Sequence, residues 1–278
     1  MDSKIKTADG TETFINSEFN EAYHSTKAGA YTESLHKFVL PCGIDRLVKE
    51  KERVRVLDVG FGLGYNVAVA VETAQKNNPQ AFLEITSIEK DRDIFKKIRE
   101  LSIPENLRDI YSQILSGGFE ENIYTAEGTN FILRVIFGDA RQIIKQLKGP
   151  FDAVFYDAFS PKVNTEMWTV EMFSSVKKLM DRRAVLATYS ASLAVRKGLV
   201  EAGFKIGLVE PVGRKSYSTV ATIEGDIPPL TEKERYRLEH SPYALPYRDS
   251  PDMNLPREKI KENWEKQLQD RLSKQNNP

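Results

Sequence analysis

Apolar runs alternate with amphipathic stretches from about residue 54 to residue 223, and this alternation predicts strands that are each followed by a helix. The expected strands are nearly continuous in apolar residues, as in sheets that are buried on both faces. They are Val54–Val59, Phe82–Ile88, Phe131–Phe137, Phe151–Tyr156 and Ala184–Tyr189. The expected helices are Gly64–Lys76, Arg141–Leu147, Met172–Leu179 and Leu193–Ala202. This order indicates a doubly wound, mostly parallel α/β sheet.

The two ends of the chain differ from this region in composition and in the periodicity of their apolar residues. Residues 1–45 are polar and aromatic, with a helical pattern only over Thr32–Val39. Phe204–Val209 and Tyr217–Ile223 read as an antiparallel hairpin at the sheet edge. Seven of the thirteen prolines follow Gly225, which predicts an extended surface tail. Within that tail, apolar residues recur at four-residue spacing, which predicts a docked helix over Glu258–Leu272. These residues are Ile260, Trp264, Leu268 and Leu272.

These differences in sequence pattern divide the chain into three expected parts. Residues 1–45 form a segment that covers the substrate and the cofactor, residues 46–225 form the α/β domain, and residues 226–278 form a proline-rich extension that ends in a helix. The extension carries ten acids and ten bases, so it is not a basic nucleic-acid arm.

Composition excludes several classes of protein. One cysteine and three histidines rule out a disulfide framework and a cysteine-rich zinc site, and no metal is expected. No apolar run is long enough for a signal peptide or a membrane span, so we expect a soluble cytoplasmic protein with no membrane partner. The 40 bases equal the 40 acids, so any nucleic-acid contact must come from a local patch.

A glycine-rich turn joins the first expected strand to its helix, in the pattern Asp58-x-Gly60-x-Gly62-x-Gly64. Glycines there permit positive φ and let the backbone approach a ligand. A dinucleotide site prefers G-x-G-x-x-G, whereas here the third glycine comes one residue earlier and an acid precedes the first. The pattern suits a nucleotide-like cofactor with an amino acid group and no pyrophosphate; the alternative is a purely structural turn.

Three further strands end next to an acid. Glu89 follows the second strand, where it can bond ribose hydroxyls or be a plain surface acid. Asp139 and Ala140 follow the third strand, where they can bind an adenine while Asp139 also caps a helix. Asp157 follows the fourth. Because ligands of open α/β sheets bind outside the carboxyl ends of strands, we expect these groups in one crevice, with Asp157 beside the reactive centre.

Other residues are candidates for substrate contacts. Tyr23 and His24 lie in the N-terminal segment, and the plainer interpretation of His24 is a hydrogen-bonded loop residue. Phe159, Pro161 and Trp168 follow the fourth strand and are either pocket walls or core. Two dibasic pairs are either phosphate contacts or solvated surface, namely Arg196 with Lys197 and Arg214 with Lys215.

The glycine turn with Glu89, Asp139 and Asp157 resembles the class I S-adenosylmethionine-dependent methyltransferases over about residues 50–225. A more specific resemblance covers most of residues 8–222. The block Asp157-x-Phe159-x-Pro161-x-x-Asn164-x-x-Met167-Trp168 is similar to the methyltransferase part of the MnmC-type tRNA wobble-uridine modification enzymes. So are Asp9-Gly10-Thr11, Glu21-Ala22-Tyr23-His24-Ser25, Ala187-Thr188-Tyr189, Val195-Arg196-x-Gly198-Leu199 and Gly213-x-Lys215.

The resemblance implies a Rossmann-like fold and S-adenosyl-L-methionine-dependent methylation of 5-aminomethyl(-2-thio)uridine at the wobble position of tRNA. The product is 5-methylaminomethyl(-2-thio)uridine, formed by direct in-line attack of the amine. Asp157 is expected to orient the amine, because an ordinary aspartate is a poor base for an alkylammonium. Many members carry a C-terminal FAD-dependent oxidase. After Gly225 there is no second glycine-rich turn and too little length for one, so the expectation is a stand-alone methyltransferase without FAD.

An anticodon-loop substrate also implies contacts with unpaired bases and with phosphates. The candidate stacking partners are Tyr23, Phe159, Trp168 and Tyr189. The candidate phosphate contacts are Lys27, Arg196, Lys197, Arg214 and Lys215.

Three other functions fit parts of the pattern. An aminopropyltransferase acting on a small amine uses a related cofactor. The N-terminal motifs Asp9-Gly10-Thr11 and Glu21-Ala22-Tyr23-His24-Ser25, which resemble the tRNA-modifying family, argue against it. An NAD(P)-dependent oxidoreductase would use Glu89 on a ribose, but the short glycine spacing and Asp139 argue against it. A non-enzymatic tRNA-binding module is disfavoured by the intact cofactor signature.

Overall fold

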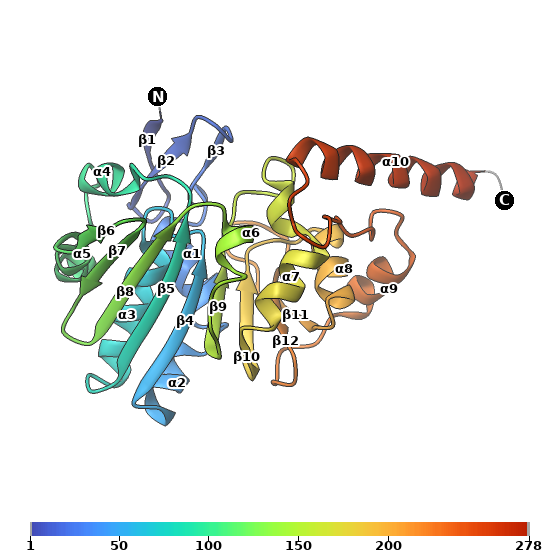
Figure 1. Ribbon diagram of the computed structural model, residues 1–278. Coiled ribbons are helices and arrows are strands. Elements are labelled where there is room, and N and C mark those ends of the chain that lie inside the picture. The colour runs from blue at the N-terminus through green and yellow to red at the C-terminus, as the bar shows by residue number, and fades with distance from the viewer. Residues whose placement is uncertain (1, 277–278) are drawn as a thin grey trace.

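The computed structural model describes residues 2–276, and in them a nine-stranded sheet carries helices on both faces (Figure 1). The strand order is β11-β12-β10-β9-β4-β5-β8-β7-β6. The five central strands, β10 to β8 in that order, are parallel. Their bounds are β4 (Arg53–Val59), β5 (Phe82–Glu89), β8 (Phe131–Phe137), β9 (Phe151–Tyr156) and β10 (Met180–Thr188). The expected doubly wound sheet is therefore confirmed.

Antiparallel strands complete both edges of this sheet. At one edge β12 (Ser218–Thr222) pairs with β10, and β11 (Lys205–Val209) pairs with β12, which confirms the expected hairpin. At the other edge β7 (Ile123–Glu127) pairs with β8, and β6 (Gly118–Glu120) pairs with β7. This second pair was not predicted. β6 has only three residues, all exposed, and β7 alternates in burial over only five residues, so both are short for a periodic signal.

Two hydrophobic clusters fill the two faces of the sheet. Neighbouring strand residues point to opposite faces, so Val56 joins one cluster and Leu57 joins the other. The first cluster takes in α2 and α3, and the second takes in α7 and α8. The helices are α1 (Ala30–Ser34), η1 (Leu35–Val39), α2 (Ile44–Glu50), α3 (Tyr65–Asn77), α4 (Ile94–Arg99), η2 (Glu105–Leu107), α5 (Arg108–Leu115), α6 (Ala140–Ile143), η3 (Thr165–Trp168), α7 (Val170–Lys177), α8 (Leu193–Glu201), α9 (Glu232–His240) and α10 (Arg257–Asn276).

Helix α6 is shorter than the sequence pattern suggests. The Asp139 side chain accepts a hydrogen bond from Arg141 N and caps its start. The helix ends at Ile143 rather than near Leu147. A turn over residues 144–146 follows, and Pro150, which disfavours helical geometry at Gly149, leads the chain into β9.

The N-terminal segment forms a small antiparallel sheet of its own. Its strands are β1 (Ser3–Lys6), β2 (Glu12–Asn16) and β3 (Glu21–Ala22). They lie above the carboxyl ends of the central strands (Figure 1). Sequence patterning did not reveal them, because strands of two to five residues are too short to show a period.

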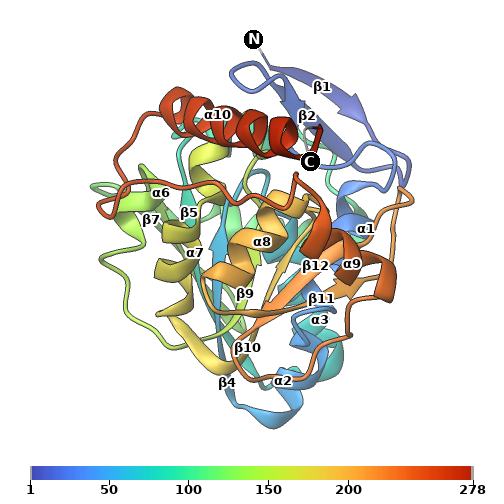
Figure 2. The ribbon, with the colours of Figure 1, turned by 90° about the vertical axis from the view of Figure 1, so that its right-hand side faces the viewer.

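The C-terminal extension packs back on the same edge of the domain. Helix α10 contains the expected docked helix, with Ile260 and Leu268 buried and Trp264 Nε1 donating to Leu245 O at 2.7 Å. It lies beside the N-terminal sheet (Figure 2). Its Arg257 pairs with Glu166 at 2.8 Å and lies over the ring of Phe19 at 4.8 Å. None of the helices within residues 2–276 combines the length and apolarity needed to cross a membrane.

Candidate active site

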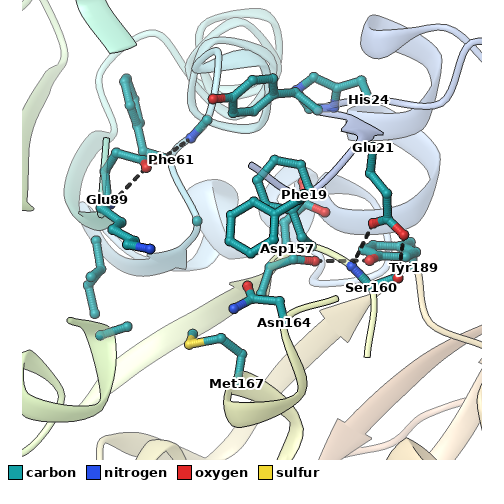
Figure 3. A pocket seen from close by; sticks show the side chains of 18 of the residues that line it. Phe19, Glu21, His24, Phe61, Glu89, Asp157, Ser160, Asn164, Met167 and Tyr189 are labelled. Atoms are coloured by element: carbon teal, nitrogen blue, oxygen red, sulfur yellow. Dashed lines mark hydrogen bonds between the residues drawn. The ribbon is translucent and has the colours of Figure 1, made fainter. Parts of the chain in front are cut away.

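A cavity of about 600 Å³ opens at the carboxyl ends of the central strands. Its floor comes from the loops after β4, β5, β8 and β9, and its roof comes from residues 19–25 of the N-terminal segment. Figure 3 shows Asp157 in its middle, with Glu89 on one side and Glu21 and Ser160 on the other. The strand-end residues expected to converge therefore do so.

The glycine turn after β4 requires backbone geometry that other residues rarely adopt. Gly60 and Gly62 have φ of +98° and +53° and line the cavity, and Gly64 has φ +79° at the start of α3. A Cβ on Gly60 would stand 2.6 Å from Asp157 O. The turn can thus lie directly against the loop that carries Asp157 only if position 60 is glycine.

Asp58 does not line the cavity. It is fully buried behind the turn, where Ser87 Oγ donates to its Oδ2 at 2.8 Å. Burial raises the pKa of Asp58 well above its ordinary value, with smaller contributions from the charges of Asp157 and Glu89. Its Oδ1 is buried without a hydrogen-bond partner among the residues described.

Glu89 is held rigidly at the end of β5. Its Oε2 accepts from Gly62 N at 2.8 Å, and its Oε1 accepts from the backbone N–H groups of Lys90 and Asp91 at 2.7 and 2.8 Å. A carboxylate has about four acceptor positions, so roughly one remains for a ligand hydroxyl. Burial raises the pKa of Glu89, against the lowering effect of these bonds.

Asp139 and Ala140 line the cavity after β8. Asp139 caps α6 through Arg141 N at 2.9 Å and also pairs with the Arg141 guanidinium at 2.9 Å. Its side chain is still 45% exposed, which leaves acceptor capacity toward the cavity. Capping and ligand binding can therefore coexist at this residue.

Asp157 stands in a cluster of buried polar groups. Asn66 Nδ2 donates to its Oδ2 at 2.7 Å. Glu33 lies nearby, paired with Lys37 at 2.6 Å and with His24 Nδ1 at 3.7 Å. Burial raises the pKa of Asp157 to about 7; the charge on Glu33 adds to the rise, while His24, Asn66 and Lys37 oppose it. Burial alone would raise the pKa of Glu33, but His24 and Lys37 lower it to about 2.

An aromatic wall closes the other side of the cavity. Phe159 stacks on Phe19 with ring centroids 4.5 Å apart, and Tyr23 meets Phe159 at 5.2 Å. The Tyr189 hydroxyl donates to Ala158 O at 2.9 Å, and Ser160 N donates to Glu21 at 2.9 Å. Of the expected contacts, Tyr23, His24, Phe159, Tyr189 and Arg214 line this cavity.

Other expected contacts lie elsewhere. Trp168 is fully buried beneath the cavity and donates to Phe159 O at 2.8 Å. Arg196 is also buried, with Nε bonded to Thr219 Oγ1, Nη2 bonded to Tyr217 O and Nη1 paired with Glu234. Its donors are therefore occupied by protein groups rather than presented to a phosphate. Pro161 borders a neighbouring groove, and Lys27, Lys197 and Lys215 lie outside the cavity lining.

Several lining residues were not singled out as site residues by sequence reasoning. They are Phe19, Glu21, Glu33, Lys37, Asn164, Met167 and Arg141. Glu21, Asn164 and Met167 stand inside the segments that carry the family resemblance, which was the available signal. Phe19 and Lys37 carry no local signal, because only the folding of the N-terminal segment over the sheet brings them to the cavity.

Comparison with known proteins agrees with this geometry. Residues 102–224 match the family described as S-adenosyl-L-methionine-dependent methyltransferase. An uncharacterized protein of Methanocaldococcus jannaschii is 34% identical over 266 residues, which are 94% of this chain and 71% of that protein. The crystal structure of MnmC2 from Aquifex aeolicus has a TM-score of 0.88 and 39% identity, over 97% of this chain and 86% of that chain.

A longer relative matches over part of its length. The tRNA 5-methylaminomethyl-2-thiouridine biosynthesis bifunctional protein MnmC of Pseudomonas syringae is 31% identical over 209 residues, or 71% of this chain and 31% of that protein. The chain spans about a third of the length of the bifunctional relatives that it matches.

Proposed function

The chain belongs to the MnmC-type family of S-adenosyl-L-methionine-dependent methyltransferases, and on this premise we propose that it methylates 5-aminomethyl(-2-thio)uridine at the wobble position of tRNA. The product is 5-methylaminomethyl(-2-thio)uridine. The observation that carries the proposal is one cavity that joins the strand-end groups of a nucleotide site to Asp157 and to an aromatic wall. A tRNA substrate also implies that the protein works in the cytoplasm.

The residues of the cavity fit the methyl donor. Gly60 and Gly62 let the backbone come close, Glu89 retains an acceptor position for a ribose hydroxyl, and Asp139 with the N–H of Ala140 suits an adenine edge. When bound, S-adenosylmethionine supplies an electrophilic methyl group on a sulfonium, which is a good leaving group. The protein's own task is then mainly to align the two reactants, which can contribute on the order of 7–11 kcal/mol.

Asp157 is the proposed catalytic residue, and its surroundings extend the role expected from sequence. The amine must lose a proton before it can act as a nucleophile. An ordinary aspartate lies about 6.5 pKa units below an alkylammonium, or about 9 kcal/mol. With its pKa raised to about 7, the gap falls to about 3.4 units, or about 5 kcal/mol. Asp157 can thus orient the amine and also accept its proton.

The aromatic wall is proposed to hold the uracil ring. An unpaired base that has left its stack is recognised by stacking on aromatic rings and by hydrogen bonds to its edge. Phe159 is fixed by Phe19 and Tyr23, and Arg214 reaches the cavity with its guanidinium bonded to Tyr189 O. Residues 1–45 would accordingly serve as the segment that closes over both ligands, since residues 19–25 form the roof.

The proposal is tested by nucleoside analysis of tRNA. Wobble-modified tRNA carrying 5-aminomethyl-2-thiouridine is incubated with the protein and methyl-labelled S-adenosylmethionine, then digested and analysed by mass spectrometry. Label is expected in 5-methylaminomethyl-2-thiouridine, with equal loss of the aminomethyl nucleoside. The matched control is the same tRNA with an unmodified wobble uridine, which should take no label. Label in any other nucleoside would contradict the proposal.

A further inference from the structure

A second groove lies directly beside the catalytic cavity. It has a volume of about 830 Å³ and shares Glu21 and Ser160 with the cavity. One wall is the loop after β9, at Pro161 and Lys162, and the start of α8. The opposite wall comes from the C-terminal extension, at Arg237 and Ser241 near the end of α9, Tyr243 and Tyr247 in the following loop, and Lys261, Trp264 and Glu265 of α10. We call it the flanking groove.

Positive charge lines the flanking groove. Lys162 and Lys261 are exposed, and within residues 2–276 neither forms an ion pair. Arg237 is half exposed and pairs with Glu234 at 2.8 Å. The acids that line it are Glu21, which is bonded to Ser160, and Glu265. The two unpaired lysines are therefore placed to attract an anionic ligand.

Aromatic rings give the same groove a stacking surface. Tyr243 is 52% exposed, so its ring is available to a ligand in the groove. In the same lining, Tyr247 packs against Trp264 with ring centroids 5.1 Å apart, and Trp264 Nε1 donates a hydrogen bond to Leu245 O. The groove lining thus combines one solvent-exposed ring with a packed pair of rings.

We propose that the flanking groove binds a nucleotide next to the target uridine, with its phosphate on Lys162 and Lys261 and its base on Tyr243. Cationic grooves with exposed aromatic rings are the usual means of holding single-stranded nucleic acid. The groove and the cavity are adjacent and share Glu21 and Ser160, so neighbouring nucleotides of one strand can occupy both at once. This inference rests on the proposed function and assigns the C-terminal extension a role in substrate binding.

The test compares RNA binding and methyl transfer for matched variants. The substrate is a fluorescent anticodon stem-loop RNA with 5-aminomethyluridine at the wobble position. Lys162→Glu with Lys261→Glu should weaken RNA binding by about 10- to 100-fold and lower the slope of log affinity against log salt by about 2. Tyr243→Ala should weaken it by about tenfold. The control pair Lys49→Glu with Lys178→Glu carries the same charge change on exposed lysines outside both cavities and should bind as wild type.

Two further readouts separate the possible failures. Calorimetry with S-adenosylmethionine should give the same affinity for all variants, which shows that each is folded. RNA binding that is unchanged in the groove variants would overturn the inference, as would a change equal to that of the control pair. If the wild type binds the RNA through the flanking groove but transfers no methyl group, RNA binding in the groove is supported and the proposed function is wrong.

Discussion

Asp157→Asn is expected to lower kcat/KM for methyl transfer by about 10²- to 10⁴-fold, the usual contribution of a positioned acid–base group. Asparagine keeps the size of the side chain and its place beside Asn66, but it cannot accept the proton of the ammonium. Turnover should fall more than affinity for the methyl donor, because the strand-end groups that bind the donor are untouched. Steady-state kinetics and calorimetry measure the two effects separately.

The matched control for this variant is Asp152→Asn. Asp152 lies on the same strand, β9, but pairs with Lys51 and with Arg55 N at the other end of the sheet. The chemical change is identical, and activity should stay close to wild type. Equal loss in both variants would mean that strand stability, and not the chemistry of Asp157, explains the effect.

Asp157→Asn should also stabilise the folded protein at high pH. The pKa of Asp157 is raised from 3.8 to about 7 in the folded state, so the folded protein binds more protons than the unfolded chain between those values. Wild-type stability therefore falls as pH rises from about 4 to about 7. At pH 8 the charged carboxylate costs at most about 4 kcal/mol, a penalty that asparagine removes. The melting temperature of the variant should exceed that of wild type at pH 8, and the difference should vanish near pH 4.

Gly60→Ala is expected to abolish binding of S-adenosylmethionine and to lower stability by about 2–4 kcal/mol. The new Cβ would stand 2.6 Å from Asp157 O and 3.0 Å from Asp157 C, so the backbone of one of the two loops must move. The shift would displace the turn and the catalytic carboxylate together. Thermal unfolding and donor calorimetry measure the two losses.

Gly10→Ala is the control that isolates this clash. Gly10 has a similar φ of +85°, but a Cβ there meets nothing within 4 Å. The control thus carries only the strain of positive φ, about 1 kcal/mol, and should bind the donor normally. A Gly60→Ala protein that binds the donor as well as the Gly10→Ala protein does would show that close approach of the two loops is not needed.

The strand ends of the site could be predicted from sequence, whereas its closure could not. Glu89, Asp139 and Asp157 each follow an apolar strand, and parallel strands bring their carboxyl ends to one edge. Phe19 and Lys37 reach the cavity only because the N-terminal segment, with its small sheet and η1, packs at that edge. The raised pKa of Asp157 likewise depends on burial and on Glu33, which is 124 positions away in the chain.

Cations were the least predictable class of residue. Arg196 lies three residues from both Leu193 and Leu199, which are buried, so its helical position already favoured the interior. Its long side chain reaches protein partners from there, and its pairing with Glu234, 38 positions away, has no local signal in the chain. The balanced charge of the C-terminal extension similarly concealed Lys261, which reaches the flanking groove opposite Lys162 of the loop after β9 only after folding.

In the proposed reaction, one cavity holds the methyl donor and the target amine on either side of Asp157. A crystal structure with S-adenosylhomocysteine and an anticodon stem-loop bearing 5-aminomethyluridine tests this most directly. We expect a ribose hydroxyl on Glu89, the adenine near Asp139, and the aminomethyl nitrogen hydrogen-bonded to Asp157. A donor bound away from the carboxyl ends of β4 and β5, or a uridine whose amine points away from Asp157, would contradict it.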